Sequence, residues 1–212
     1  HPDAMVLGRP VKICLNREEV FYMHRGRHPV LMKLRTGVSK DGKLTAMHLQ
    51  TLVDGGGYGS YGVASTFYTG ALQTVTYHLP RYKFDAARVF TNKPPCGPKR
   101  GHGTPQPRFG QEIQLDKIAE KLGLDPAEMR LGMIVKPDSI TANWLKVGTV
   151  GLAQCIRTVV ERSEWKEKHK KLPFGRGVGI ACGSYLCGAG LPIYWNKMPQ
   201  SGVQLLVDRS GQ

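Results

Sequence analysis

A run rich in proline and glycine, from Pro94 to Gln106, holds the residues whose chemistry most readily suggests a binding site. Arg100 can clamp an anion, and its backbone amide and those of Gly101 and Gly103 can donate hydrogen bonds to a ligand. His102 offers a ring that can stack on a ligand, donate a proton or accept one. On residue chemistry alone, the run is either a ligand site or a rigid connector between two elements.

Other polar or glycine-rich clusters lack the spacing that a site needs. The run Gly55–Gly57 has neither the GxGxxG nor the GxxxxGK[ST] pattern of phosphate loops, so it indicates a bend or bulge at a strand end. His24 and His28 stand four residues apart, as metal ligands do on a helix. Gly26 and Pro29 oppose that helix, so we expect no metal bound directly by these side chains.

The carboxylates and cysteines form no further pattern that indicates a catalytic or metal site. Asp54 and Asp85 each stand without a partner carboxylate that would indicate paired acid–base chemistry. The five cysteines are an odd number with no CxxC pair. This pattern favours reduced thiols over a disulfide framework or a cysteine-based metal centre, and we expect a cytoplasmic protein.

The formal net charge of +14 admits several anionic partners: nucleic acid, a cofactor, a substrate or an acidic subunit. Most basic residues are spread along the chain, and the cluster at 162–171 carries the interspersed glutamates of a solvated helix face. Because no zinc finger, RRM signature or basic-region heptad accompanies the charge, nucleic acid is not favoured. No apolar run approaches the roughly 20 residues that cross a bilayer, so no membrane association is expected.

Strands and helices that could position the run are predicted on both sides of it. Strand patterns occur at 11–15, at 29–38 and 44–53 around an Asp41-Gly42 turn, and at 82–91. Helices are predicted after the Asn16 cap with Glu19, within 60–77, at 109–122 before Gly123, after Asp125-Pro126, and as one helix over 148–171. Residues 92–107 are expected to be irregular, and β character returns at 179–182 and 203–207.

Several motifs of the chain stand in a fixed order around the run. They are Gly8-Arg-Pro-Val-Lys12, Asn16-Arg-Glu-Glu19, Gly26-Arg-His-Pro29, Asp41-Gly42, Asp54-Gly-Gly-Gly-Tyr58, Thr91-Asn-Lys-Pro-Pro95, Arg100-Gly-His-Gly-Thr-Pro-Gln106 and Leu122-Gly-Leu-Asp-Pro-Ala-Glu-Met-Arg130. In order and approximate spacing this set resembles the molybdopterin-binding subunits of the xanthine dehydrogenase and aldehyde oxidase family. The resemblance is strong over residues 8–132 and weak beyond.

The resemblance implies an α+β (mixed α/β) fold and a division of the chain. Residues 1–150 would form most of the first molybdenum-cofactor-binding domain, 151–173 a connecting helix and linker, and 174–212 the first strands of a second such domain. The chain would be an internal fragment of a large subunit. The family's catalytic glutamate would then lie beyond it, so no catalytic residue is expected within these residues.

The resemblance also assigns roles within the run. Arg100, Gly101 and Gly103 would bind the cofactor, since Arg100 matches an arginine whose backbone amide faces it. His102 stands where many members place an aromatic that contacts the substrate. A histidine there departs from the commoner phenylalanine and is most similar to the 4-hydroxybenzoyl-CoA reductase branch. Residues 65–73 lack the arginine that purine-oxidising members carry, which disfavours xanthine as the substrate.

The function implied is an oxidoreductase with a molybdenum–molybdopterin cofactor, the cytosine dinucleotide form being one option. Iron–sulfur clusters and FAD would lie on partner subunits. The substrate would be aromatic or heteroaromatic, with a CoA thioester as one candidate, and the reaction either hydroxylation or reductive dehydroxylation. Two alternatives stay open: a basic polyanion-binding module without catalysis, and an inactive gene fragment.

Overall fold

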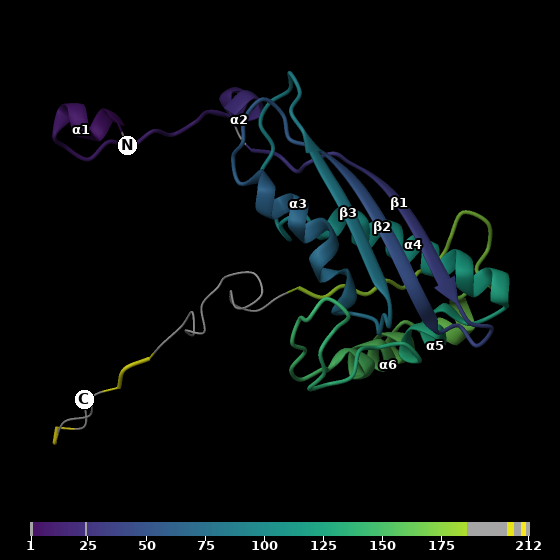
Figure 1. Ribbon diagram of the computed structural model, residues 1–212. Coiled ribbons are helices and arrows are strands. Elements are labelled where there is room, and N and C mark those ends of the chain that lie inside the picture. The colour runs from purple at the N-terminus through teal and green to yellow at the C-terminus, as the bar shows by residue number, and fades with distance from the viewer. Residues whose placement is uncertain (1, 24, 186–202, 206–208, 211–212) are drawn as a thin grey trace.

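A computed structural model describes residues 2–23, 25–185, 203–205 and 209–210 (Figure 1). Helices and strands are mixed along these residues, which confirms the predicted mixed α/β class. The elements are α1 (Pro2–Leu7), α2 (Arg17–Met23), β1 (Val30–Val38), β2 (Leu44–Asp54), α3 (Gly62–Ala71), the 3₁₀ turn η1 (Leu72–Thr74), β3 (Tyr82–Val89), α4 (Pro105–Leu122), α5 (Pro126–Leu131), α6 (Leu152–Arg162) and α7 (Trp165–Lys168). None of the helices in the described ranges could span a membrane.

The predicted hairpin is confirmed, and a third strand extends it. β1 and β2 pair antiparallel, while β3 lies parallel to β2 after the crossover through α3. The turn closes through hydrogen bonds from Ser39 N to Lys43 O and from Gly42 N to Ser39 O, both 2.9 Å. Gly42 has φ +83°, a conformation that glycine adopts without steric cost.

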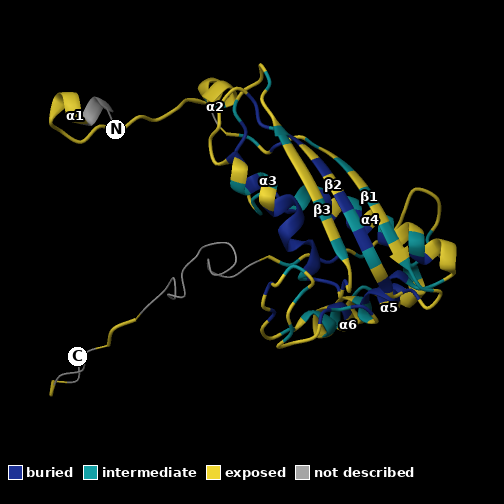
Figure 2. Ribbon diagram, viewed as in Figure 1, coloured by how far each residue is buried: buried dark blue, intermediate teal, exposed yellow. Residues whose placement is uncertain are grey.

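The two faces of the sheet have different surroundings. Side chains on one face pack against α3 and α4: Tyr82 donates from its hydroxyl to Gly70 O (2.9 Å), and Thr36 Oγ1 donates to Gln114 Oε1 (2.6 Å). Alternating residues point the other way, so exposed and half-buried positions alternate along β1 (Figure 2). Figure 1 shows the sheet crossing in front of α4, with its other face open to view.

Local caps form where the sequence predicts them. Asn16 and Glu19 exchange hydrogen bonds of 2.8 and 2.9 Å between their side chains and backbone amides, which is the reciprocal capping box that opens α2. Gly123 ends α4 with φ +68°. Asp125 caps α5 by accepting from the amides of Ala127 and Glu128. All of these partners lie within five residues of each other in the chain.

Four predictions of secondary structure are wrong. Residues 11–15 form no strand, because no neighbouring strand pairs with them in the described structure. The predicted helix 148–171 is two helices, since Glu164 takes φ +54° between α6 and α7. The irregular run ends at Thr104, and Pro105 opens α4 as proline does at a first helical turn. Residues 179–182 and 203–205 form no strand; 206–207, like His24 and Cys187, lie outside the described residues.

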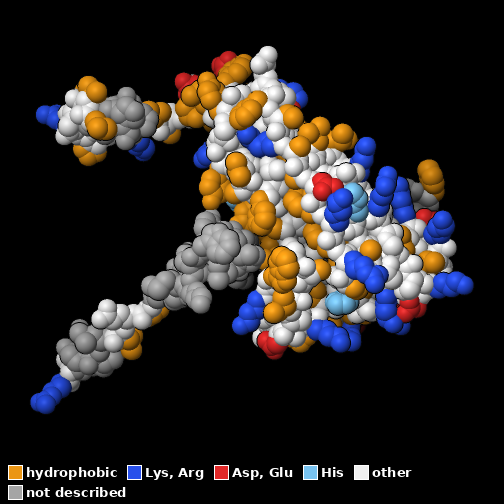
Figure 3. Space-filling model, in the orientation of Figure 1, with side chains coloured by type: hydrophobic (Ala, Val, Ile, Leu, Met, Phe, Trp, Pro, Cys, Tyr) orange, Lys and Arg blue, Asp and Glu red, His pale blue; other side chains and the backbone are white. Residues whose placement is uncertain are grey.

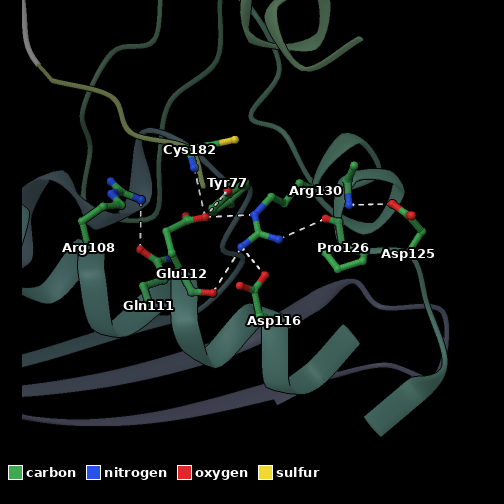
Figure 4. Close-up of polar contacts among 10 residues, drawn as sticks. Tyr77, Arg108, Gln111, Glu112, Asp116, Asp125, Pro126, Arg130 and Cys182 are labelled. Carbon is green, nitrogen blue, oxygen red and sulfur yellow. Dashed lines mark hydrogen bonds and ion pairs between the residues drawn. The ribbon is translucent and has the colours of Figure 1, made fainter. Parts of the chain in front are cut away.

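A buried polar network ties the helical layer together (Figure 4). Glu112 Oε2 accepts hydrogen bonds from Arg130 Nε (2.9 Å), Tyr77 OH (3.1 Å) and Cys182 N (3.0 Å). The last contact occupies the Cys182 amide, which is therefore not available to a neighbouring strand. Ile156 of α6 also belongs to the main hydrophobic cluster. The division of the chain into residues 1–150, 151–173 and 174–212 stays a prediction.

Candidate functional site: the turn at residues 100–103

The segment between β3 and α4 is fixed by loops that are distant in sequence. Cys96 N donates to Gly55 O (3.1 Å), and Gly97 N donates to Gly26 O (2.9 Å). Gly26 and Cys96 also form an isolated parallel bridge. These contacts bring two glycine-containing motifs of the sequence against the proline-rich run.

The glycine run after β2 is a bend that accommodates this segment, as the sequence predicts. Gly55 N donates to Val89 O (2.8 Å) at the end of β3. Gly56 has φ +67°, and a Cβ atom there would lie 2.2 Å from Pro94 O. Only glycine fits so close an approach of two backbones. The run therefore serves chain packing at this end of the sheet.

Asp54 anchors the start of the same segment. Its carboxylate accepts from Lys93 Nζ (2.6 Å), Thr91 Oγ1 (2.6 Å) and the Gly56 amide (3.1 Å). The hydrogen bond from Lys93, followed by that from Thr91, holds the pKa of Asp54 well below its usual range. The carboxylate that the sequence leaves isolated is thus a positioning group for the loop.

The next part of the loop is a strained turn. Four consecutive residues have positive φ: Arg100 (+34°), Gly101 (+98°), His102 (+38°) and Gly103 (+85°). A Cβ atom on Gly103 would lie 2.1 Å from Ser65 O, so a glycine is required there for packing as well as for conformation. Positive φ at a non-glycine residue costs free energy, and such residues cluster at functional sites.

The backbone of this turn has donors to offer. None of the hydrogen bonds among the described residues uses the amides of residues 100–103 as donors. The Arg100 carbonyl is occupied, because it accepts from Arg27 Nη2 (2.9 Å). Beyond the turn, Gln106 Nε2 donates to His28 O (2.9 Å). Two contacts to residues 27 and 28 therefore hold the turn on either side while its amides stay available to an acceptor.

The His102 ring lies beside two aromatic side chains, one in α3 and one at the residue just before α3. Its centroid is 5.2 Å from that of Tyr61, nearly parallel at 26°, and 4.7 Å from that of Tyr68, tilted by 50°. Nε2 of His102 is buried and has no hydrogen-bond partner in the part of the chain that the structure describes. Burial lowers the pKa of His102, and a hydrogen bond with the Tyr61 backbone opposes that shift.

A second histidine lies close to this group. His28 is 3% exposed, and its Nε2 also lacks a partner among the described residues. Its pKa is lowered first by burial, then by the positive charge of Arg88 and by the neighbouring titratable ring of His102. Both imidazoles are therefore neutral near pH 7, and each keeps a ring nitrogen that can accept a hydrogen bond.

The site residues predicted from the sequence thus lie in one turn, but the sequence did not reveal what surrounds them. Arg27, Tyr61 and Tyr68 were not predicted to contact it. Arg27 belongs to the Gly26–Pro29 motif, so motif order alone could have pointed to it. The two tyrosines belong to a segment with no motif, and only the packing of α3 brings them to His102.

Comparison with known proteins decides the family. The sequence model of the protein family described as the molybdopterin cofactor-binding domain matches residues 3–132, which is more than half of the chain. The chain belongs to this family. The match includes the turn at 100–103 and ends just after α5.

Individual relatives agree with this assignment. The xanthine dehydrogenase molybdenum-binding subunit of Escherichia coli O157:H7 is 33% identical over 215 residues, covering 96% of this chain and 27% of that protein. The nicotinate dehydrogenase large molybdopterin subunit of Eubacterium barkeri is 37% identical over 123 residues, covering 58% and 29%. The chain therefore spans just over a quarter of the length of these relatives.

The fold agrees with solved structures of the same group. The aldehyde oxidoreductase from Desulfovibrio gigas superposes with a TM-score of 0.72 at 28% identity, over 81% of this chain and 19% of that one. The chain is thus homologous to molybdenum-dependent oxidoreductases of the xanthine dehydrogenase and aldehyde oxidoreductase family, as the order of its motifs indicates.

Proposed function

We propose that this chain forms one wall of the cofactor site in a molybdenum-dependent oxidoreductase. The backbone amides of Arg100, Gly101 and Gly103 would face the molybdopterin cofactor, and His102 would face the substrate. One observation carries the proposal: four consecutive residues with positive φ present amides that have no acceptor among the described residues.

The residues of the turn fit an anionic, oxygen-rich group. Backbone amides in a turn form a concave set of donors suited to such oxygens. The Arg100 side chain is exposed and adds a positive charge beside them. When bound, a molybdenum–pterin cofactor supplies two-electron oxidation–reduction at a substrate carbon. The protein's part would be to hold the amides in place through Arg27 and to present the His102 ring. The cofactor would be molybdopterin itself or its cytosine dinucleotide form.

We propose an aromatic or heteroaromatic substrate, by hydroxylation or reductive dehydroxylation. Tyr61, Tyr68 and His102 form a group of planar side chains beside the turn, which suits a planar ring. A relative is named for nicotinate, a heteroaromatic acid. An aromatic CoA thioester is the specific candidate, because its phosphates suit a chain of net charge +14. Partner subunits carrying iron–sulfur clusters and FAD would exchange the electrons, in the cytoplasm.

Hydrogen–deuterium exchange tests the placement of the cofactor. The polypeptide that carries this sequence is produced in a host that makes molybdopterin, and its molybdenum and pterin are measured after purification. Amides of residues 100–103 should exchange more slowly in the loaded protein than in protein stripped of cofactor. Loaded protein with unchanged exchange at this turn would contradict the site, and absence of molybdenum and pterin would contradict the function.

Arg27 provides a variant that separates the turn from the rest of the fold. Its side chain holds the Arg100 carbonyl and is itself exposed. Arg27→Ala should speed exchange at residues 100–103 and lower the molybdenum content, while the melting temperature changes little. Arg17→Ala, at an exposed arginine of α2, is the matched control and should leave the molybdenum content unchanged.

A further inference from the structure

The open face of the sheet carries an ordered pattern of side chains. The register places Arg35 opposite His48, and His48 opposite Lys83, so these three basic side chains form one row across the strands. Two residues along the strands comes a row of Lys33, Gln50 and Asp85, and two residues further Leu31, Leu52 and Ala87 form an apolar row. Alternation puts all three rows on the face away from α3 and α4.

The face is hollowed as well as charged. A hollow of about 480 Å³ is lined in part by Arg35, His48, Arg81 and Lys83. A second hollow, of about 370 Å³, is lined in part by Leu31, Leu52 and Ala87. Figure 3 shows this side of the molecule, with Lys and Arg side chains gathered over the sheet and apolar side chains beside them.

We infer that this face, defined by Arg35, His48, Arg81 and Lys83 with the apolar row beside them, docks an acidic polypeptide surface. The charge argues for an acidic partner, since four basic side chains face one carboxylate, Asp85. The neighbouring apolar row argues for a polypeptide, because protein interfaces combine apolar contact with charge, whereas nucleic-acid sites rely on the charge along the phosphate backbone.

Asp85 already shows how a carboxylate sits on this face. Its Oδ2 lies 2.7 Å from His48 Nε2 and 3.7 Å from Lys83 Nζ. The hydrogen bond with His48 lowers the pKa of Asp85, so this carboxylate stays ionised near neutral pH. A carboxylate of the partner would therefore meet Arg35 and Arg81 directly and compete with Asp85 for Lys83.

The test measures binding of fluorescein-labelled oligoglutamate to the 212-residue chain by fluorescence anisotropy at low salt. Arg35→Gln/Lys83→Gln should weaken binding about three- to tenfold, the effect of losing two exposed charge pairs. Asp85→Asn should tighten it about twofold, because the competing carboxylate is gone. Lys117→Gln/Lys121→Gln, on the exposed side of α4, is the control of equal charge and should change affinity less than twofold.

Three outcomes would overturn the proposal. Oligoglutamate that fails to bind saturably at low salt would remove the docking surface altogether. A loss of equal size in the α4 control would show that only the total charge matters. A single-stranded oligonucleotide that binds more tightly than oligoglutamate, and responds to the same two substitutions, would assign the face to nucleic acid. Circular dichroism of each variant checks that the fold is retained.

Discussion

Arg130 and Glu112 form an ion pair in the interior, with 2.9 Å between Arg130 Nε and Glu112 Oε2 and side-chain exposures of 0% and 6%. Arg130 also reaches Asp116 Oδ1 (2.8 Å), so one guanidinium joins α5 to α4. Glu112 in turn bonds to Tyr77 and Cys182. The pair therefore fixes the orientation of α4, the helix that starts directly after the turn at 100–103.

Breaking this pair should destabilise the fold strongly. Arg130→Met should lower the free energy of unfolding by about 3–5 kcal/mol, because Glu112 is left as a buried charge without its cation. Urea titration measures the loss. The double variant Arg130→Met/Glu112→Met should lose less than the sum of the two single variants, since neither member of the pair is then left buried without the other. Strictly additive losses would contradict the coupling.

Gly103→Ala tests the strained turn. The new Cβ would lie 2.1 Å from Ser65 O at a residue with φ +85°, so the loop or α3 must shift. We expect a loss of about 2–4 kcal/mol in the free energy of unfolding. Gly177→Ala is the control, because it meets no atom within 4 Å and has no positive φ. Equal stability of the two variants would show that the turn is not constrained.

Asp125 joins two helices and allows a matched comparison. One carboxylate oxygen caps α5, and the other accepts from Trp165 Nε1 (2.8 Å). Asp125→Ala should cost about 2 kcal/mol, from loss of the cap and of the indole hydrogen bond. Asp125→Asn keeps an acceptor and should cost much less. Thermal unfolding monitored by circular dichroism distinguishes the two, and equal losses would exclude a role for these hydrogen bonds.

The two buried histidines predict how stability depends on pH. Burial lowers the pKa of both His28 and His102 in the folded state. The unfolded chain therefore binds protons first, and stability should fall as pH drops below about 6.5, the unfolded value for histidine. Above that value both states are neutral, and the histidines contribute no slope.

Urea midpoints at pH 7.5 and 5.5 check this prediction. The parent chain should lose more stability between these values than His28→Gln/His102→Phe does, because the variant has removed both titrating groups. His78→Gln is the control, because this histidine is exposed. A parent and double variant with the same pH dependence would show that other groups set the acid sensitivity.

The sequence alone determined the features that depend on near neighbours in the chain. The Asn16–Glu19 box, the Asp41-Gly42 turn, the Gly123 stop and the Asp125 cap are each formed by residues at most five positions apart. Hydrogen bonds at this range follow from residue type and backbone conformation, so a local pattern suffices. The order of motifs also identified the family without any contact being known.

Tertiary structure decided what lies around the turn and which strands form. Residues 11–15 have a strand pattern but no strand to pair with among the described residues, and a strand needs a partner to satisfy its backbone. Arg27 meets the Arg100 carbonyl across 73 residues, and Tyr61 and Tyr68 reach His102 only because α3 packs beside the loop. The row formed by Arg35, His48 and Lys83 needs the register of three strands. Such contacts depend on the packing of whole elements, which residue spacing does not encode.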